Sequence, residues 1–203
     1  MSVVIFALLN NKNNTMKQFV LSFFAIALLA VNSFAGNGKP VNVSASKVNW
    51  KAYKVTGSHE GYVNVKSGTL DFNGETLAGG KFVIDMSSIN ATDVSGKTKE
   101  NLDGHLKSED FFGVAKYPEA KLEITRVISK GKAGEYKVVA NLTIKNTTKE
   151  IKFDAMVANG KATANIKLDR TDFDVRYGSG SFFDNLGDKT IYDEFDLMVS
   201  LAY

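Results

Sequence analysis

Side chains that could carry out catalysis are few in this sequence. It has no cysteine, which excludes thiol catalysis, disulfide bonds, iron–sulfur clusters and zinc sites with cysteine ligands. His59 and His105 are the only histidines, so they are the only candidates for the base that serine-type hydrolysis requires. His59-Glu60 begins like the helical zinc-protease motif, but Val63 stands where the second histidine is needed. We therefore predict no catalytic residue set, no metal site, no cofactor and no enzymatic activity.

Two glycine-containing stretches match known functional loops only in part. Gly96-Lys97-Thr98 resembles the end of a phosphate-binding loop, but the glycine required five residues earlier is Ala91. The stretch 178–181 approaches the nucleophile elbow of hydrolases, yet its fifth position is Phe182 instead of glycine. We interpret both as surface loops.

Acidic side chains gather near the C-terminal end of the chain. Their spacing does not fit a calcium-binding loop, which needs acids two residues apart followed by glycine. Arg170, Arg176 and Lys189 are interleaved with them. We interpret the group as solvated strand ends and ion pairs, with an incidental calcium site as the alternative. The acids are Asp169, Asp172, Asp174, Asp184, Asp188, Asp193, Glu194 and Asp196.

Residues 1–35 have the features of a secretory signal peptide. Lys17 precedes the apolar run 19–31, and the segment ends with small residues at Ser33 and Ala35. The run is shorter than the roughly 20 residues that span a membrane. We expect a true start at Met16, cleavage after Ala35, and a periplasmic or secreted protein, with an uncleaved anchor as the alternative. ATP and NAD(P)H are scarce in those compartments, which argues against kinases and dehydrogenases.

The remaining chain has the composition of one ordinary globular domain. Hydrophobic residues make up 44% of the sequence and charged residues 23%. The net charge of +3 falls to +1 without Lys12 and Lys17 of the leader, and no run of five or more like charges occurs. Nucleic acid is therefore not an expected partner. We place a short tail at 36–45 and a single domain at 46–203.

The elements of this domain are predicted mainly as strands. Apolar residues alternate with polar ones along most of the chain, which indicates eight or more antiparallel strands with one apolar face each. Glycine pairs and Asn-Gly pairs between the runs predict hairpin turns. The predicted turns are Ser67-Gly68, Asn73-Gly74, Gly79-Gly80, 131–134 and Asn159-Gly160.

The stretch 98–112 breaks the alternation. Leu102 and Leu106 have helical spacing. Ser108, followed by two acids, has the pattern of an N-cap for a second short helical turn, and Phe111 and Phe112 then form an apolar wedge. We predict a short helical insertion between two strands.

A closed barrel can accommodate many alternating strands, because closure removes the exposed edges of the sheet. A two-sheet sandwich would produce the same alternation. An eight-stranded barrel is wide enough either to be filled by side chains or to hold one small ligand. The residues alone leave these alternatives open.

The order of several motifs then points to a family. The stretch NLDGHLKSEDFF at 101–112, followed by KYPEA at 116–120, resembles the central motif of the YceI-like, polyisoprenoid-binding family. GSHEG at 57–61, NLTIKNTTK at 141–149, DRTDF at 169–173 and the last strand, 191–202, resemble further family segments in the same order. Asn146 and Asp174 depart from the pattern, because the family commonly has glycine at both positions. The resemblance covers residues 46–203.

The resemblance implies an all-β, lipocalin-like, extended antiparallel barrel of about eight strands. It implies an apolar tunnel for a long-chain amphiphile such as a polyisoprenoid, an isoprenoid quinone or another long-chain lipid. It carries over no catalytic residues. Transient membrane contact and a homodimer are left open.

Within that picture we assign three groups of residues. Phe111 and Phe112 are predicted to plug or gate one end of the tunnel. His59, His105, Arg170 and Tyr177 are predicted to lie near the polar head group, with structural roles as the alternative for His105 and Arg170. The predicted tunnel lining is Trp50, Phe82, Ile84, Leu122, Tyr136, Val138, Phe153 and Leu197.

Three functions compete at this point. The first is an exported carrier or sequestering protein for a lipid. The second is a filled barrel that acts as a partner-binding or structural module, which exposed aromatic residues at Tyr53, Tyr62 or Tyr192 would favour. The third is an enzyme acting on an amphiphile, which would need a buried acid–base pair.

Overall fold

The computed structural model describes residues 37–203. The predicted leader, the start at Met16 and the cleavage after Ala35 lie outside these residues. Strand β1 lies within the segment that was expected to be a short tail.

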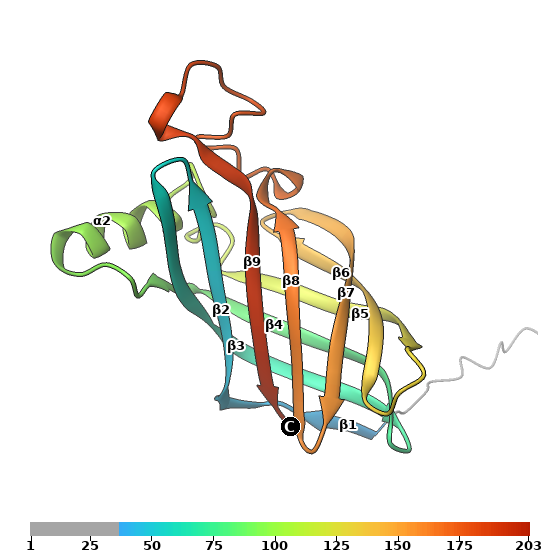
Figure 1. Ribbon diagram of the computed structural model, residues 1–203. Coiled ribbons are helices and arrows are strands. Elements are labelled where there is room, and N and C mark those ends of the chain that lie inside the picture. The colour runs from blue at the N-terminus through green and yellow to red at the C-terminus, as the bar shows by residue number, and fades with distance from the viewer. Residues whose placement is uncertain (1–36) are drawn as a thin grey trace, which may run out of the picture. The chain divides into compact units, whose positions relative to one another are not determined.

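The described chain is built mainly from long antiparallel strands (Figure 1). Three helical segments interrupt them: α2 (Gly96–Lys107), and the 3₁₀ turns η1 (Arg170–Phe173) and η2 (Gly187–Lys189). The strands are β1 (Asn37–Pro40), β2 (Asn42–Lys54), β3 (Gly57–Asn73), β4 (Thr76–Ala91), β5 (Glu119–Ser129), β6 (Glu135–Ile144), β7 (Thr147–Ala158), β8 (Lys161–Asp169) and β9 (Ile191–Ala202).

Strands β2 to β9 close into a barrel. The sheet order is β1-β3-β2-β9-β8-β7-β6-β5-β4, and the additional pairing of β3 with β4 completes the circle. Apart from β1, which adds to β3, each strand pairs with its neighbours in sequence, and β9 returns to β2. The predicted antiparallel barrel of about eight strands is confirmed, and the sandwich alternative is excluded.

Three of the five predicted turns are correct. Asn73-Gly74, the segment 131–134 and Asn159-Gly160 connect consecutive strands. Ser67-Gly68 and Gly79-Gly80 instead lie inside β3 and β4, so those two predictions are wrong. The reason at Gly68 is close packing, because a Cβ there would lie 2.6 Å from Cδ1 of Phe82. This glycine makes room for an aromatic ring inside the barrel.

The predicted helical insertion is confirmed as α2, between β4 and β5. A turn follows Ser108 as predicted, over residues 109–112, and the N–H of Phe111 donates to the carbonyl of Ser108 at 3.1 Å, but the turn is not helical and the Ser108 hydroxyl does not cap it. Ser108 ends α2 instead, and its hydroxyl donates to the carbonyl of His105 at 2.8 Å.

The two ends of the barrel differ. α2 and the connection from η1 to β9 lie at one end, called the helical end, and β1 lies at the opposite end, called the far end (Figure 1). At the far end the rings of Phe72 and Tyr203 pack with centroids 5.3 Å apart. The ammonium of Lys39 from β1 lies 4.7 Å from the centroid of Phe72. Burial raises the pKa of the Tyr203 hydroxyl. Phe72, Tyr203 and Lys39 therefore pack against one another at the far end.

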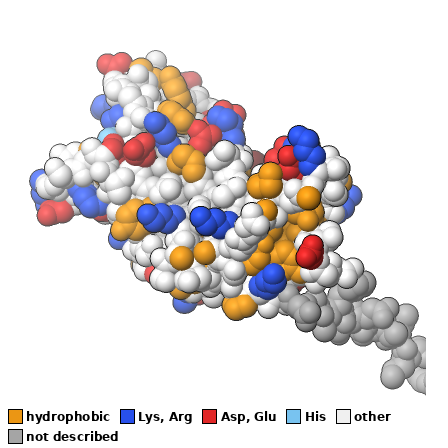
Figure 2. All heavy atoms as spheres, turned by 60° about the horizontal axis from the view of Figure 1, so that its bottom comes forward, with side chains coloured by type: hydrophobic (Ala, Val, Ile, Leu, Met, Phe, Trp, Pro, Cys, Tyr) orange, Lys and Arg blue, Asp and Glu red, His pale blue; other side chains and the backbone are white. Residues whose placement is uncertain are grey.

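The outer surface carries charges of both signs side by side (Figure 2). Lys81–Glu123 at 2.9 Å joins the neighbouring strands β4 and β5, and Lys66–Glu119 at 2.8 Å joins β3 to the start of β5 across β4. The hydrogen bond and charge of Glu119 raise the pKa of Lys66. Among residues 37–203, no helix has both the length and the apolar character needed to cross a bilayer.

Candidate functional site

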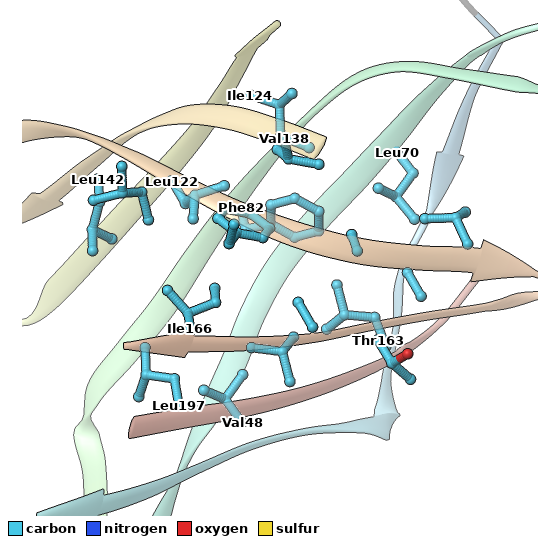
Figure 3. A pocket seen from close by; sticks show the side chains of 18 of the residues that line it. Val48, Leu70, Phe82, Leu122, Ile124, Val138, Leu142, Thr163, Ile166 and Leu197 are labelled. Atoms are coloured by element: carbon cyan, nitrogen blue, oxygen red, sulfur yellow. The ribbon is translucent and has the colours of Figure 1, made fainter. Parts of the chain in front are cut away.

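The barrel interior contains two chambers. The one toward the far end, called the far chamber, has a volume of about 120 Å³. Its lining side chains are hydrocarbon except for that of Thr163, which carries the one oxygen among the side chains drawn in Figure 3. Leu122, Val138 and Phe153 project into it from three adjacent strands. The far chamber therefore offers an almost purely apolar surface.

The second chamber lies under the helical end and is called the helix-side chamber. Its volume is also about 120 Å³. Trp50, Met86 and Phe195 form part of its wall, and Phe111 with Phe112 lines it from the segment after α2. Among the described residues, the lining residues with a nitrogen or oxygen in their side chain are Trp50, Arg170 and Tyr192.

The two chambers share part of their lining. Four residues line both of them, and we call this set the waist. Val48 and Leu197 come from the neighbouring strands β2 and β9, whereas Ile84 and Leu142 come from β4 and β6 on the other wall. Because the waist side chains are aliphatic, a hydrocarbon chain that passes from one chamber to the other meets no polar group there.

The interior is not filled by its own side chains. Ile124, Ile151, Phe153 and Val199 line the far chamber, yet each is only partly buried. A packed core normally leaves few voids larger than a water molecule. The partial exposure of these wall residues is what an open apolar space inside a barrel produces.

Trp50 is positioned by a glycine on the neighbouring strand. Trp50 in β2 is the register partner of Gly61 in β3. A Cβ at position 61 would lie 2.7 Å from Cζ2 of Trp50 and 1.9 Å from the carbonyl oxygen of Asn90. The indole therefore lies across the bare backbone of β3, and it is 6% exposed.

An aromatic cluster covers the helix-side chamber. The rings of Phe111 and Phe112 meet edge to face with centroids 5.1 Å apart. His105 of α2 backs Phe111 at 5.4 Å and contacts Tyr177 at 4.4 Å. The predicted placement of Phe111 and Phe112 at one end of the tunnel agrees with this geometry, and their gating role stays a prediction.

α2 is fastened to the barrel by Asp103. Its carboxylate accepts from the backbone N–H of Ala91, at the end of β4, at 2.7 Å and from Nζ of Lys99 at 2.8 Å. Burial acts to raise the pKa of Asp103, but these hydrogen bonds and the charge of Lys99 outweigh it and lower the pKa. Lys99 also donates to the carbonyl of Ala91. Asp103 and Lys99 therefore position the cover of the chamber.

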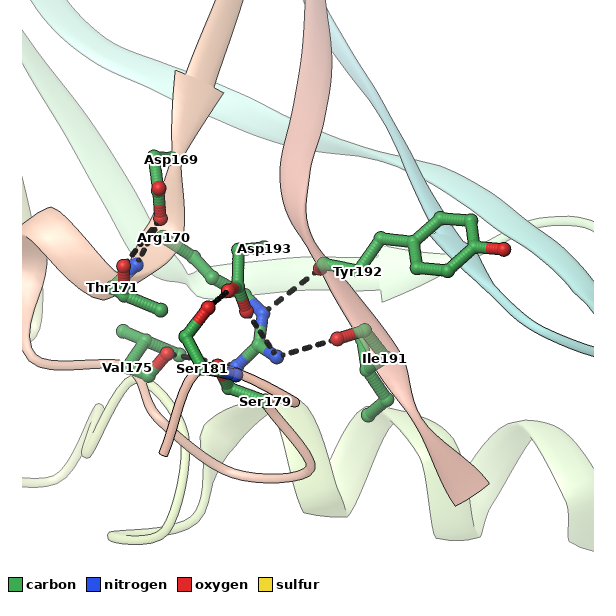
Figure 4. A network of polar contacts seen from close by, with 9 residues as sticks. All are labelled: Asp169, Arg170, Thr171, Val175, Ser179, Ser181, Ile191, Tyr192 and Asp193. Carbon is green, nitrogen blue, oxygen red and sulfur yellow. Dashed lines mark hydrogen bonds and ion pairs between the residues drawn. The ribbon is translucent and has the colours of Figure 1, made fainter. Parts of the chain in front are cut away.

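Arg170 ties the helical end together (Figure 4). Its side chain is 3% exposed and donates to the carbonyl oxygens of Tyr192, Ile191 and Val175 at 3.1, 3.0 and 2.8 Å. Nη2 also pairs with Asp193 at 3.2 Å. Burial lowers the pKa of Arg170. The charge of Asp193 acts to raise the pKa but does not outweigh burial. The guanidinium thus joins η1, the following loop and the start of β9.

The structure brings most of the predicted residues together. Of the eight residues predicted to line a tunnel, all except Tyr136 line at least one of the two chambers. Tyr136 is buried outside both chambers, and its hydroxyl accepts from the backbone N–H of Leu77 at 3.3 Å. Whether the lining residues bind a ligand stays a prediction.

The four residues predicted to lie near a head group are found in different places. Arg170 lines the helix-side chamber, whereas His105 lies outside the lining and contacts both Phe111 and Tyr177. His59 is remote from both linings, and its Nδ1 lies 2.8 Å from Asp93. Burial acts to raise the pKa of Asp93, but the bonds from His59 and the Glu60 N–H lower it. His59 therefore pins β3 to the segment before α2.

Six of the eight C-terminal acids have structural partners among residues 37–203. Asp169 caps η1 by accepting from the N–H of Thr171 at 2.8 Å, and Asp193 accepts from Ser181 Oγ at 2.7 Å. Among residues 37–203, no group of three or more histidine or acidic side chains is arranged to hold a metal ion.

The two departures from the glycine pattern also have local explanations. Asp174 has a left-handed backbone, with φ of 59°, which is why glycine suits that position. In the turn between β6 and β7 the left-handed residue is Lys145, with φ of 57°, and not Asn146. Nζ of Lys145 donates to the carbonyl of Asp174 at 2.9 Å, so the two turns brace each other.

Sequence reasoning missed Asp103, Asp193 and half of the waist. Val48 and Leu142 belong to recognised alternating runs, so the apolar register contained that signal. Nothing in the local sequence marks Asp103 or Asp193, because their partners lie on other elements.

Comparison with known proteins gives consistent matches. The YceI-like domain family matches residues 40–203. A UPF0312 protein of Vibrio parahaemolyticus is 30% identical over 146 residues, which cover 63% of this chain and 74% of the relative. A UPF0312 protein of Pectobacterium atrosepticum is 29% identical over 69% of this chain and 72% of its own length.

Solved structures share the fold. Burkholderia cenocepacia BcnA superimposes with a TM-score of 0.65 at 20% identity, over 80% of this chain and 99% of its own. A polyisoprenoid binding domain from Saccharophagus degradans, described as implicated in plant cell wall breakdown, gives a TM-score of 0.54 at 16% identity, over 80% and 97% of the two chains. At these identities the likeness concerns the fold.

Proposed function

The chain belongs to the YceI-like domain family, and on that premise we propose that it holds the apolar tail of a long-chain amphiphile inside its barrel. A polyisoprenoid, an isoprenoid quinone or a similar lipid fits this description. The proposed role is transport, storage or sequestration of that lipid in the periplasm or outside the cell. A binding domain for polyisoprenoids among the structural neighbours supports the choice of ligand class.

The observation that carries the proposal is the unfilled, nearly all-hydrocarbon interior. Transfer of each CH₂ group from water to an apolar site is worth about 0.8 kcal/mol. The two chambers meet at the aliphatic waist, so a single chain can occupy both. Each chamber is of the order of an engineered cavity of about 150 Å³ that binds benzene. A long isoprenoid must therefore move wall side chains or extend beyond one end of the barrel.

The helical end is the proposed site of ligand access. At the far end Phe72 packs against Tyr203, and β1 pairs with β3. The helical end carries exposed aromatic residues on the loop before β9, among them Phe182 and Phe183 at 47% and 51% exposure. Aromatic residues of this kind suit the boundary between water and a lipid surface. Transient contact with a membrane at this end would let a tail move directly into the helix-side chamber.

The decisive experiment is native mass spectrometry of the mature protein purified from its own envelope or medium, followed by organic extraction and lipid identification. A stoichiometric long-chain amphiphile is the expected result. The purified protein is then stripped and incubated with polyprenyl phosphates and quinones. Protein that is empty when purified and stays empty after both incubations contradicts the proposal.

A second candidate function has one specific observation in its favour. Tyr62 and Tyr192 are 41% and 51% exposed, as expected for a module that binds a protein partner. Tyr53 does not add to this, because its hydroxyl donates to Asp196 at 2.7 Å. An empty barrel that elutes with a protein partner would favour this candidate over lipid binding.

A further inference from the structure

The indole N–H of Trp50 is a hydrogen-bond donor without an acceptor among the described residues. Trp50 lines the helix-side chamber, and its Nε1 is buried without a partner among residues 37–203. Buried polar groups in proteins nearly always have a partner, so each exception needs an explanation. An indole N–H can only donate. A ligand that completes this site must therefore present an acceptor atom.

The charge of the chamber restricts that acceptor. Arg170 is the one charged residue among the described residues that line either chamber. Its guanidinium already donates to three backbone carbonyls and pairs with Asp193. A phosphate or carboxylate buried beside Trp50 would therefore lack a free cation, and burial of an unpaired ion is costly. A neutral oxygen meets the need of Trp50 without that cost.

The orientation of a bound ligand follows from the difference in polarity between the two chambers. The far chamber is lined by hydrocarbon, and its single lining residue with a polar side chain, Thr163, is exposed to solvent. The other buried ring nitrogen without a partner in the described chain, Nε2 of His105, also lies at the helical end, behind Phe111. The unmet polar groups are thus gathered at one end of an apolar path.

We propose that Trp50 selects an amphiphile whose polar group is a neutral, carbonyl-type oxygen, held in the helix-side chamber, with the tail passing through the waist into the far chamber. This assignment rests on the proposed lipid-binding function. It goes further by naming the class of head group, the residue that recognises it and the direction of the tail.

The test uses Trp50 as its own reporter, because it is the only tryptophan in the chain. Three probes with the same alkyl chain are titrated: a methyl ketone, the matched hydrocarbon and the matched phosphate monoester. Binding is measured by native mass spectrometry and by tryptophan emission. The ketone is expected to bind about three- to tenfold tighter than the hydrocarbon, the usual effect of one neutral hydrogen bond. It alone is expected to move the emission to longer wavelength.

The variant Trp50→Phe keeps an aromatic ring but removes the donor. It is expected to lose the preference for the ketone while keeping its affinity for the hydrocarbon. Tyr62→Phe, which removes a polar group from an exposed ring that lines neither chamber, serves as the matched control and keeps the preference. If Trp50→Phe does not fold, the three-probe series on the unaltered protein decides the question.

The outcomes distinguish the role assigned to Trp50 from the proposed lipid binding. Equal affinity for ketone and hydrocarbon, or tightest binding of the phosphate monoester with a response from Trp50, overturns the assignment to Trp50 and leaves lipid binding intact. Failure of all three probes to bind overturns the proposed function itself.

Discussion

Arg170 makes contacts that no other cationic side chain could reproduce. A planar guanidinium reaches several acceptors at once, whereas an ammonium is a compact point charge. Replacement of Arg170 by Met would leave Asp193 and the carbonyls of Val175, Ile191 and Tyr192 without their donor. Removal of one partner from a buried charged pair costs about 3–5 kcal/mol. We expect a loss of that size in the free energy of unfolding, measured with urea.

The control for Arg170 is an exposed arginine in the same region. Arg176 pairs with Asp174 at 2.9 Å, but both side chains are more than half exposed. Exposed pairs contribute about 0–1 kcal/mol. Arg176→Lys should therefore unfold almost as the unaltered protein does. Similar losses for Arg170→Met and Arg176→Lys would contradict the role assigned to Arg170.

Asp103 should make stability depend on pH. Because its pKa is lowered in the folded protein, its contribution is present above the ordinary carboxyl value near 3.8 and is lost as the pH falls through the lower folded value. Asp103→Asn removes the charge that faces Lys99. We expect this variant to be less stable by about 1–3 kcal/mol at pH 7, the range for hydrogen bonds to charged groups, with the difference shrinking toward pH 3. Urea unfolding at pH 7, 5 and 3 measures it.

The exposed carboxylate of Asp184 supplies the comparison for Asp103. It has no hydrogen bond or ion pair within residues 37–203, so Asp184→Asn should have little effect at any of these pH values. A difference between Asp103→Asn and the unaltered protein that stays constant from pH 7 to pH 3 would show that the charge of Asp103 contributes nothing.

Individual residues differed in how far the sequence could predict them. Trp50, Phe82 and Phe153 were predictable as wall residues because the register of an alternating strand places every second residue inside. Tyr136 shares that register, but it lies outside both chambers and its hydroxyl binds Leu77. Contacts between distant elements, such as Asp103 with Ala91, were not predictable because they depend on the closed fold.

Among the elements, β3 depends on glycines that permit close packing inside a strand. Gly61→Ala would place a Cβ 1.9 Å from the carbonyl oxygen of Asn90 and 2.7 Å from Trp50. Overpacking of this kind costs about 1–3 kcal/mol. We expect reduced thermal stability together with altered emission from Trp50, because the indole must move.

The matched change for Gly61 lies in α2. A Cβ at Gly104 meets no atom within 4 Å. Alanine is better than glycine inside a helix by about 0.5–1 kcal/mol, so Gly104→Ala should raise stability and leave the emission of Trp50 unchanged. Equal effects of the two substitutions would show that close packing at Gly61 is not the determinant.

Glycines inside strands explain why the strands were predicted better than their ends. Alternation identified the strands, and Asn-Gly pairs identified turns, because left-handed conformations suit those residues. Ser67-Gly68 and Gly79-Gly80, by contrast, were wrongly predicted to be turns. A Cβ at Gly80 would lie 2.7 Å from the carbonyl of Thr69, so glycine serves close approach there. Composition alone does not separate these two uses of glycine.

At the scale of the whole molecule, the barrel couples two chambers through one waist, so chain length should be limited by the far chamber. Leu122 lines the far chamber, and the neighbouring Lys121 is exposed. An indole at position 122 would occupy much of a space of about 120 Å³, since a cavity of about 150 Å³ suffices for benzene. A tail that enters from the helical end would then have to stop near the waist.

The expected result is a shorter maximum chain length in Leu122→Trp. Native mass spectrometry with a homologous series of neutral amphiphiles gives the longest chain that each protein retains. Lys121→Trp adds the same ring one residue away on the exposed side and should retain the same chains as the unaltered protein. Short chains should still bind to Leu122→Trp, because the helix-side chamber is unchanged. If folded Leu122→Trp retained the full range of lengths, the tail would not occupy the far chamber, and the bound chain would have to leave the barrel at the helical end.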